Sequence, residues 1–244
     1  FDPAERLMDM FEGSGAVGTF FIEMGEYFWL DTYRPELARR MEEQWREMAR
    51  RGHDVQLHLH PSWLPEVGAS FEDGQWSWDM TLSKADDYPG DLTALVGRCK
   101  VKLETIIRPV KPDYVVTCFR AGAYQAQPFE ALSKALLANG LICDSSVHPG
   151  GVSAERGYDY SHAYTTHQPY FADLLDPQLR AVPAEEKIVE LPIFAPEPGR
   201  RWFLDGDEGE ALAKRLFRHE TRRKNYSTAR QRSWSNLRKI VTAA

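Results

Sequence analysis

The feature that most constrains the fold is a repeated alternation of two hydrophobic patterns. Short apolar runs typical of buried strands alternate at least four times with amphipathic patterns typical of helices. This alternation predicts a parallel α/β architecture, either a barrel or an open sheet. The strands are expected near residues 17–22, 53–60, 114–119, 141–144 and 188–192, and the helices near 2–13, 35–51, 92–107 and 128–139.

Two long segments between these elements carry no clear periodicity. Residues 62–90 form a loop rich in aromatic side chains, and residues 147–186 are irregular and rich in Tyr, His and Pro. From Gly206 the pattern is helical and increasingly basic. We therefore predict one α/β domain over residues 1–205, followed by a basic helical segment over 206–244. Its basic face is interpreted as solvated rather than as a site for an anionic partner.

Polar residues follow the predicted strands where parallel α/β folds place their chemistry. His58 and His60 end one strand, and Arg120, Asp144 and Glu190 end three others. Side chains two residues apart on a strand point to the same side, so the two imidazoles would lie together. A pair of imidazoles at a strand end can supply two of the ligands of a metal site. Each could also be a histidine that is hydrogen-bonded to backbone carbonyls.

Composition excludes some classes of protein. The chain has 244 residues and a net charge of −6, and it carries no nucleic-acid-binding motif, which argues against a nucleic-acid partner. No apolar run approaches the roughly 20 residues of a transmembrane helix. The three cysteines lack the spacing of a disulfide framework, so we interpret them as reduced thiols and expect a cytoplasmic location.

Several short motifs occur in an order that resembles the polysaccharide deacetylase family, the NodB-homology carbohydrate esterases. Gly18-Thr19-Phe20-Phe21 is similar to a strand of that family, and Gly52 to His58 is similar to the entry of its metal motif. Phe119-Arg120-Ala121-Gly122-Ala123-Tyr124 resembles its Arg-Pro-Pro-Tyr-Gly motif, and Asp144 to Val147 its next acidic motif. Glu190-Leu191-Pro192 fits a late strand seen in variant members. The resemblance covers about residues 5–195.

The resemblance implies a distorted (β/α) barrel that removes acetyl groups from an N-acetylated glycan. It also implies a divalent metal held by one Asp and two His, most often Zn²⁺, with Co²⁺, Ni²⁺ or Fe²⁺ as alternatives. The metal ligands would include His58 and His60. Arg120 would orient a catalytic carboxylate, and Asp144 would support the ligands or contact the substrate. Tyr124 and Trp63 would contact sugar rings, unless they are ordinary core aromatics.

The chain departs from the family pattern in three ways. The paired Asp residues of the family's opening strand are not found, so either that strand lies upstream of Phe1 or the chain has lost its base. His60 stands two residues after His58, where the family spaces its ligands four apart. The late strand that carries the family's proton-donating His is also not found. His148, His162 and His167 are therefore alternatives for the proton donor.

Two other functions stay open at this point. A metallohydrolase of the amidohydrolase type also uses a His-x-His pair, but it needs further histidines on later strands, where this chain offers Arg120, Asp144 and Glu190. A catalytically inactive, deacetylase-like glycan-binding protein would explain the missing Asp pair.

Overall fold

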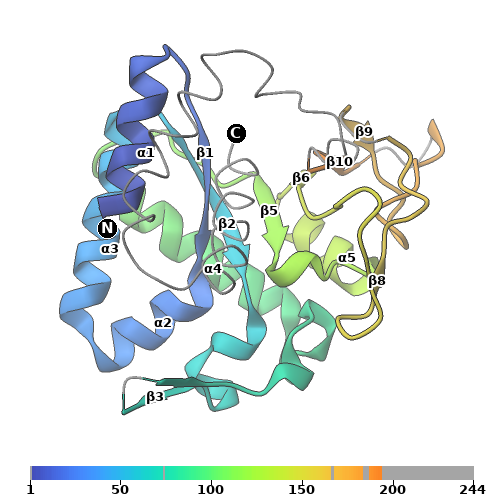
Figure 1. The fold of residues 1–244 in the computed structure, drawn as a ribbon, viewed down its shortest axis with the longest axis horizontal. Helices are drawn as coiled ribbons and strands as arrows, with labels where there is room; N and C mark the ends of the chain where they lie inside the picture. The colour runs from blue at the N-terminus through green and yellow to red at the C-terminus, as the bar shows by residue number, and fades with distance from the viewer. Residues whose placement is uncertain (1, 74, 166–167, 184–186, 194–244) are drawn as a thin grey trace, which may run out of the picture.

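The described strands form one mostly parallel sheet with helices packed against it. The structure, a computed structural model, describes residues 2–73, 75–165, 168–183 and 187–193. Six strands pair in the order β1-β2-β5-β6-β10-β9, and only β9 runs antiparallel to its neighbour (Figure 1). The strands of this sheet are β1 (Thr19–Glu23), β2 (Asp54–Leu59), β5 (Cys118–Ala121), β6 (Cys143–Asp144), β9 (Tyr170–Phe171) and β10 (Val189–Glu190).

This arrangement confirms the predicted parallel α/β architecture. Among the described residues β1 and β9 stand at the two ends of the sheet, so closure into a barrel is not confirmed. The predicted basic segment over 206–244 lies outside the described residues, as does His167.

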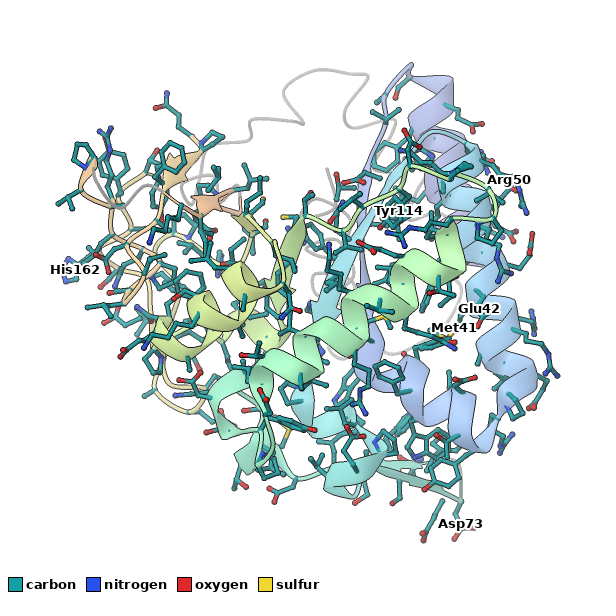
Figure 2. All side chains as sticks on the ribbon, turned by 180° about the vertical axis from the view of Figure 1, so that it is seen from behind. Met41, Glu42, Arg50, Asp73, Tyr114 and His162 are labelled. Atoms are coloured by element: carbon teal, nitrogen blue, oxygen red, sulfur yellow. The ribbon has the colours of Figure 1, made fainter. Side chains whose placement is uncertain are left out.

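Five helices accompany the sheet within the described ranges. They are α1 (Asp2–Gly13), α2 (Met24–Tyr33), α3 (Pro35–Arg50), α4 (Leu92–Ile107) and α5 (Glu130–Ala138). Helix α4 lies behind the strands in Figure 1 and in front of them in Figure 2, so it covers one face of the sheet. None of these helices combines the length and the hydropathy that a bilayer crossing needs.

Buried residues on the strands and helices form a single core. Val55, Leu57 and Leu59 of β2 are almost fully buried, as is Phe119 of β5. Val55, Leu57 and Leu59 point to one face of β2, and Gln56 on the other face is buried as well, so both faces of this parallel strand are covered. The site described below therefore stands on a buried strand that pairs with a neighbour on each side.

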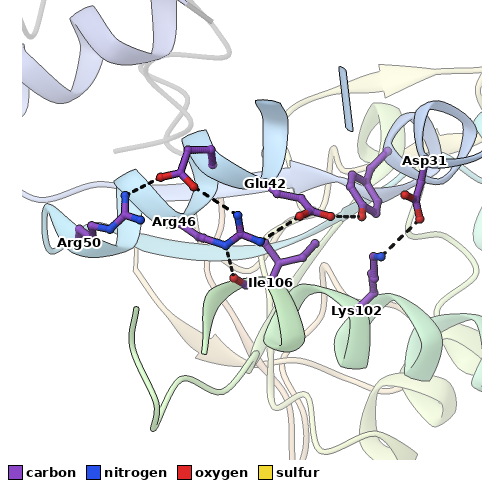
Figure 3. A network of polar contacts seen from close by, with 8 residues as sticks. Asp31, Glu42, Arg46, Arg50, Lys102 and Ile106 are labelled. Carbon is purple, nitrogen blue, oxygen red and sulfur yellow. Dashed lines mark hydrogen bonds and ion pairs between the residues drawn. The ribbon is translucent and has the colours of Figure 1, made fainter. Parts of the chain in front are cut away.

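A polar network ties α2, α3 and α4 together at the rim of the core (Figure 3). The Tyr27 hydroxyl donates to Glu42 at 2.6 Å, and Arg46 contacts the same carboxylate at 2.9 Å. Arg46 Nε also donates to the carbonyl of Ile106 in α4 at 3.0 Å. Lys102 of α4 and Asp31 of α2 form an ion pair at 3.3 Å. These contacts fix α2, which begins directly at the candidate site.

The fifth strand begins later than its sequence pattern predicts. The apolar run was expected to be a strand from Tyr114, but β5 starts only at Cys118. The backbone N–H groups of Thr117 and Cys118 donate to the side chain of Gln56 at 3.0 and 2.8 Å, and that of Val116 donates to Glu104. Side chains thus satisfy the donors that a strand would offer to its neighbour.

Short elements occupy the two segments without periodicity. Residues 61–87 contain the 3-10 turns η1 (Pro61–Trp63), η2 (Pro65–Val67), η3 (Met80–Leu82) and η4 (Ala85–Asp87), and a hairpin of β3 (Ser70–Glu72) and β4 (Gln75–Ser77). The segment after β6 contains the two-residue strands β7 (Val152–Ser153) and β8 (Tyr158–Asp159). A further turn, η5 (Gly122–Tyr124), follows β5.

Candidate metal centre

Three side chains meet at the carboxyl ends of β1 and β2. Glu23 is the last residue of β1, His58 lies in β2, and His60 follows β2 directly. In the parallel register Glu23 stands opposite His58. One ligand atom from each of the three residues lies within 4.8 Å of the others, and among the described residues this is the group that could hold a metal ion. The structure thus brings together the two predicted histidines and adds a carboxylate.

The donor set suits a divalent transition metal. Two imidazoles and one carboxylate are a ligand set found in catalytic zinc sites, which keep a further position open. Two ligands of one zinc ion lie roughly 3.4 Å apart when each bond is about 2.1 Å. Glu23 Oε2 and His58 Nε2 are 3.7 Å apart, which fits this spacing. His60 Nδ1 lies 2.5 Å from Glu23 Oε2, a direct hydrogen bond that a bound ion would replace.

The second oxygen of Glu23 is held by backbone donors. Oε1 accepts from the N–H of Gly25 at 2.7 Å and from the N–H of His60 at 3.2 Å. The first of these bonds caps the start of α2. Because Oε1 is engaged, Oε2 is the oxygen that faces the imidazoles.

Each histidine is oriented by a contact outside the triad. His58 Nδ1 is hydrogen-bonded to the carbonyl of Arg120 at 2.8 Å, which assigns the proton to Nδ1 and leaves Nε2 as the ligand atom. The ring of His60 stacks on Trp63, with centroids 4.4 Å apart and planes at 12°. These contacts hold the rings before any ion binds.

Burial sets the charge states that ligation requires. Burial, together with the neighbouring His60, lowers the pKa of His58 to about 4. Burial acts to raise the pKa of Glu23, but the two imidazoles outweigh it and keep that pKa below its ordinary value. A neutral imidazole and an ionised carboxylate are the forms that bind metals. The three side chains stay 13 to 20% exposed, so the site is sheltered but reachable from solvent.

Arg120 reaches the site through its backbone. Its guanidinium donates to the carbonyl and hydroxyl oxygens of Ser145 at 2.9 and 2.8 Å and lies over the ring of Phe21. The expectation from the resemblance was that this side chain orients a catalytic carboxylate. Its carbonyl, by contrast, directly positions a candidate ligand.

Asp144 is buried within the sheet. It has no exposed surface, it accepts from the Ser146 hydroxyl at 2.8 Å, and it stands opposite Glu190 in the register of β6 and β10. Glu190 is equally buried and accepts from the N–H of Val147. Burial raises the pKa of both carboxyls, and each neighbour affects the other. The pair therefore favours a shared proton over two charges.

Tyr124 lies at the end of a strained turn. Ala123 and Tyr124 have φ angles of 51° and 65°, which are uncommon for residues other than glycine. The Tyr124 ring packs 5.4 Å from His148 and 6.5 Å from Tyr158. Trp63, in contrast, contacts a triad residue, as described above.

Sequence reasoning missed Glu23 because the strand was expected to end at Ile22. The available signal was its place: an acidic residue directly after an apolar run, at the same end of the sheet as His58. Its side chain also caps the start of α2, a helix that the sequence analysis did not assign. His53, which directly precedes β2, is buried and accepts from the N–H of Gly18 at 3.2 Å.

Glycine at position 122 is required by the packing of His60. A Cβ added there would lie 2.5 Å from Cδ2 of His60 and 2.8 Å from the carbonyl of Leu59. Gly122→Ala is therefore expected to displace the imidazole and to weaken metal affinity about 10- to 100-fold. Competition with a chromogenic chelator measures this. The matched control is Gly13→Ala, whose added methyl meets nothing within 4 Å; equal affinities of the two variants would contradict the expectation.

Comparison with known proteins gives little further information. No protein-family model and no curated protein match the chain. A solved structure that is similar to it is a crystal structure described as that of a candidate polysaccharide deacetylase from Mycobacterium smegmatis, with 17% identity and a TM-score of 0.42. The match covers 99% of this chain, which spans 60% of the length of the other chain. A TM-score of this size does not establish a shared fold.

Proposed function

We propose that this chain is a metal-dependent hydrolase that removes N-acetyl groups from an amino-sugar glycan. The observation that carries the proposal is the triad of Glu23, His58 and His60 at the carboxyl ends of two adjacent parallel strands. The ordered motifs that resemble polysaccharide deacetylases support the choice of substrate. The same resemblance favours a distorted (β/α) barrel as the fold to which this sheet belongs.

The chain's own residues would contribute positioning and charge. Glu23, His58 and His60 would hold the ion, and a divalent ion so held would supply Lewis-acid polarisation of an amide carbonyl and lower the pKa of water. The Arg120 carbonyl keeps His58 Nε2 free to act as a ligand, and Trp63 limits the rotation of the His60 ring. Neutral His58 and anionic Glu23 would reduce the net charge of the occupied site to +1 for a divalent ion.

Acetate release from N-acetylglucosamine oligomers tests the proposal. Zinc- or cobalt-loaded protein is expected to release acetate, and the double variant His58→Ala/His60→Ala is expected to release none above background. Glu155→Gln is the control, because Glu155 is exposed on the turn between β7 and β8, a segment that contributes no residue to the triad. Equal activity in the double variant and the control, or no release by loaded wild type on several glycans, would refute the proposal.

A further inference from the structure

A row of tryptophan rings runs outward from the triad. Trp63 stacks on His60, and Trp78 lies 5.1 Å from Trp63. Trp76 of β4 lies 6.1 Å from Trp78 and 4.8 Å from the buried Trp29, which anchors it to α2. Trp63, Trp76 and Trp78, which we call the tryptophan ledge, are each only partly buried. Ring contacts therefore connect the ledge to the candidate metal centre through Trp63 and His60.

The ledge has a defined support. Trp76 pairs with Phe71 across the β3–β4 hairpin, and the buried Trp29 donates to the carbonyl of Ala69 at 2.9 Å. Trp78 donates weakly to the sulfur of Met80 at 3.0 Å. A platform of held aromatic rings binds the apolar C–H faces of sugars at low conformational cost.

The segment that carries the ledge concentrates the negative charge of the chain. Residues 62–91 contain seven carboxylates and one lysine, so their formal charge is −6. The whole chain also carries −6, so all other residues together are neutral. The seven carboxylates are Glu66, Glu72, Asp73, Asp79, Asp86, Asp87 and Asp91.

Some of these charges are engaged within the protein and others face solvent. Glu66 pairs with Arg98, and Asp91 caps α4 through the N–H of Ala94. Glu72 and Asp73 are exposed at the turn of the hairpin, and Figure 2 shows Asp73 projecting at the edge of the molecule. A segment that carries an aromatic surface and a negative charge of this size attracts cationic ligands and repels anionic ones.

We propose that the tryptophan ledge binds amino-sugar units with free, protonated amines, beside the unit whose amide is at the triad. The inference rests on the proposed function and deepens it: the preferred glycan is one already partly deacetylated. Aromatic stacking accounts for sugar binding, and the negative charge of residues 62–91 accounts for the preference for free amines over acetylated ones. Polyanionic glycans and anionic membranes are disfavoured by the same charge.

Binding to the metal-free full chain tests the ledge independently of catalysis. Isothermal titration calorimetry would compare a glucosamine hexamer with an N-acetylglucosamine hexamer at about pH 6, where an ordinary amine is protonated. The glucosamine hexamer is expected to bind at least about fivefold more tightly at about 20 mM salt, and the ratio is expected to shrink at about 200 mM. Equal affinities at low salt would overturn the inference.

Variants separate stacking from charge. Trp78→Ala is expected to weaken binding of both hexamers about three- to tenfold, and Trp78→Phe is expected to restore most of it. Glu72→Gln/Asp73→Asn should weaken only the glucosamine hexamer, whereas the exposed Glu155→Gln on the β7–β8 turn should change neither. Unchanged binding by Trp78→Ala would overturn the inference while leaving acetate release intact. Binding without acetate release by the metal-loaded protein would instead refute the proposed function alone.

Discussion

Glu23→Ala is expected to lower metal affinity by at least about 100-fold, because it removes the anionic ligand of the triad. The two histidines that remain offer no negative charge to offset that of a divalent ion. The substitution also removes the acceptor for the Gly25 N–H, so it should cost about 1 kcal/mol of stability through loss of the α2 cap. Chelator competition measures the first effect and urea unfolding of the metal-free protein measures the second.

Glu23→Gln separates these two roles. The amide oxygen of glutamine can still accept from the backbone of Gly25, so the stability of the metal-free protein should stay near that of wild type. The charge is lost in both variants, so both should lose metal affinity. Retention of affinity by either variant would show that Glu23 is not a ligand, whatever its contribution to the helix.

The second large effect is a dependence of stability on pH that comes from Asp144 and Glu190. Both carboxyls are fully buried, and burial raises their pKa above the ordinary range. The folded state therefore retains protons that the unfolded state has released above about pH 4.3. The contribution of this pair to stability is greatest at low pH and falls by about 1.4 kcal/mol per pH unit for each retained proton, until the pH passes the raised pKa.

Glu190→Gln is expected to remove the contribution of Glu190 to this loss. Its amide keeps an acceptor for the N–H of Val147 and offers a permanent donor to Asp144. The free energy of unfolding, measured in urea between about pH 5 and pH 8, should increasingly favour the variant as the pH rises. Glu5→Gln, on an exposed position of α1, is the control. Parallel profiles of wild type and Glu190→Gln would contradict a shared proton in the folded protein.

Much of the fold follows from hydrophobic period and helix capping signals. The helix expected at 92–107 has those bounds in the structure, and Asp91 caps it as an Asp at that position should. The failures have local causes. The strand expected from Tyr114 is shortened because Gln56 and Glu104, both distant in sequence, accept its backbone hydrogen bonds. Hydrogen bonds to residues that are distant in sequence cannot be predicted from a local hydrophobic pattern.

The candidate site was predictable only in part. The spacing of His58 and His60 at the end of one strand was sufficient to place the two imidazoles together, although β2 ends one residue before His60. The carboxylate came from a different strand, and its identification needed the register that sets Glu23 opposite His58. The orienting role of the Arg120 carbonyl could not be predicted from the sequence. Every residue has a backbone carbonyl, so residue type does not indicate which one will contact a ligand.

The parallel stack of His60 on Trp63 gives the molecule an internal optical reporter. An indole in face contact with an imidazole changes its emission when that imidazole gains charge or coordinates an ion. Among the tryptophans in the part of the chain that the structure describes, Trp63 alone has a ring contact with a triad residue. The difference in fluorescence between wild type and Trp63→Phe would therefore record occupancy of the centre in real time, without an added dye or a turnover assay.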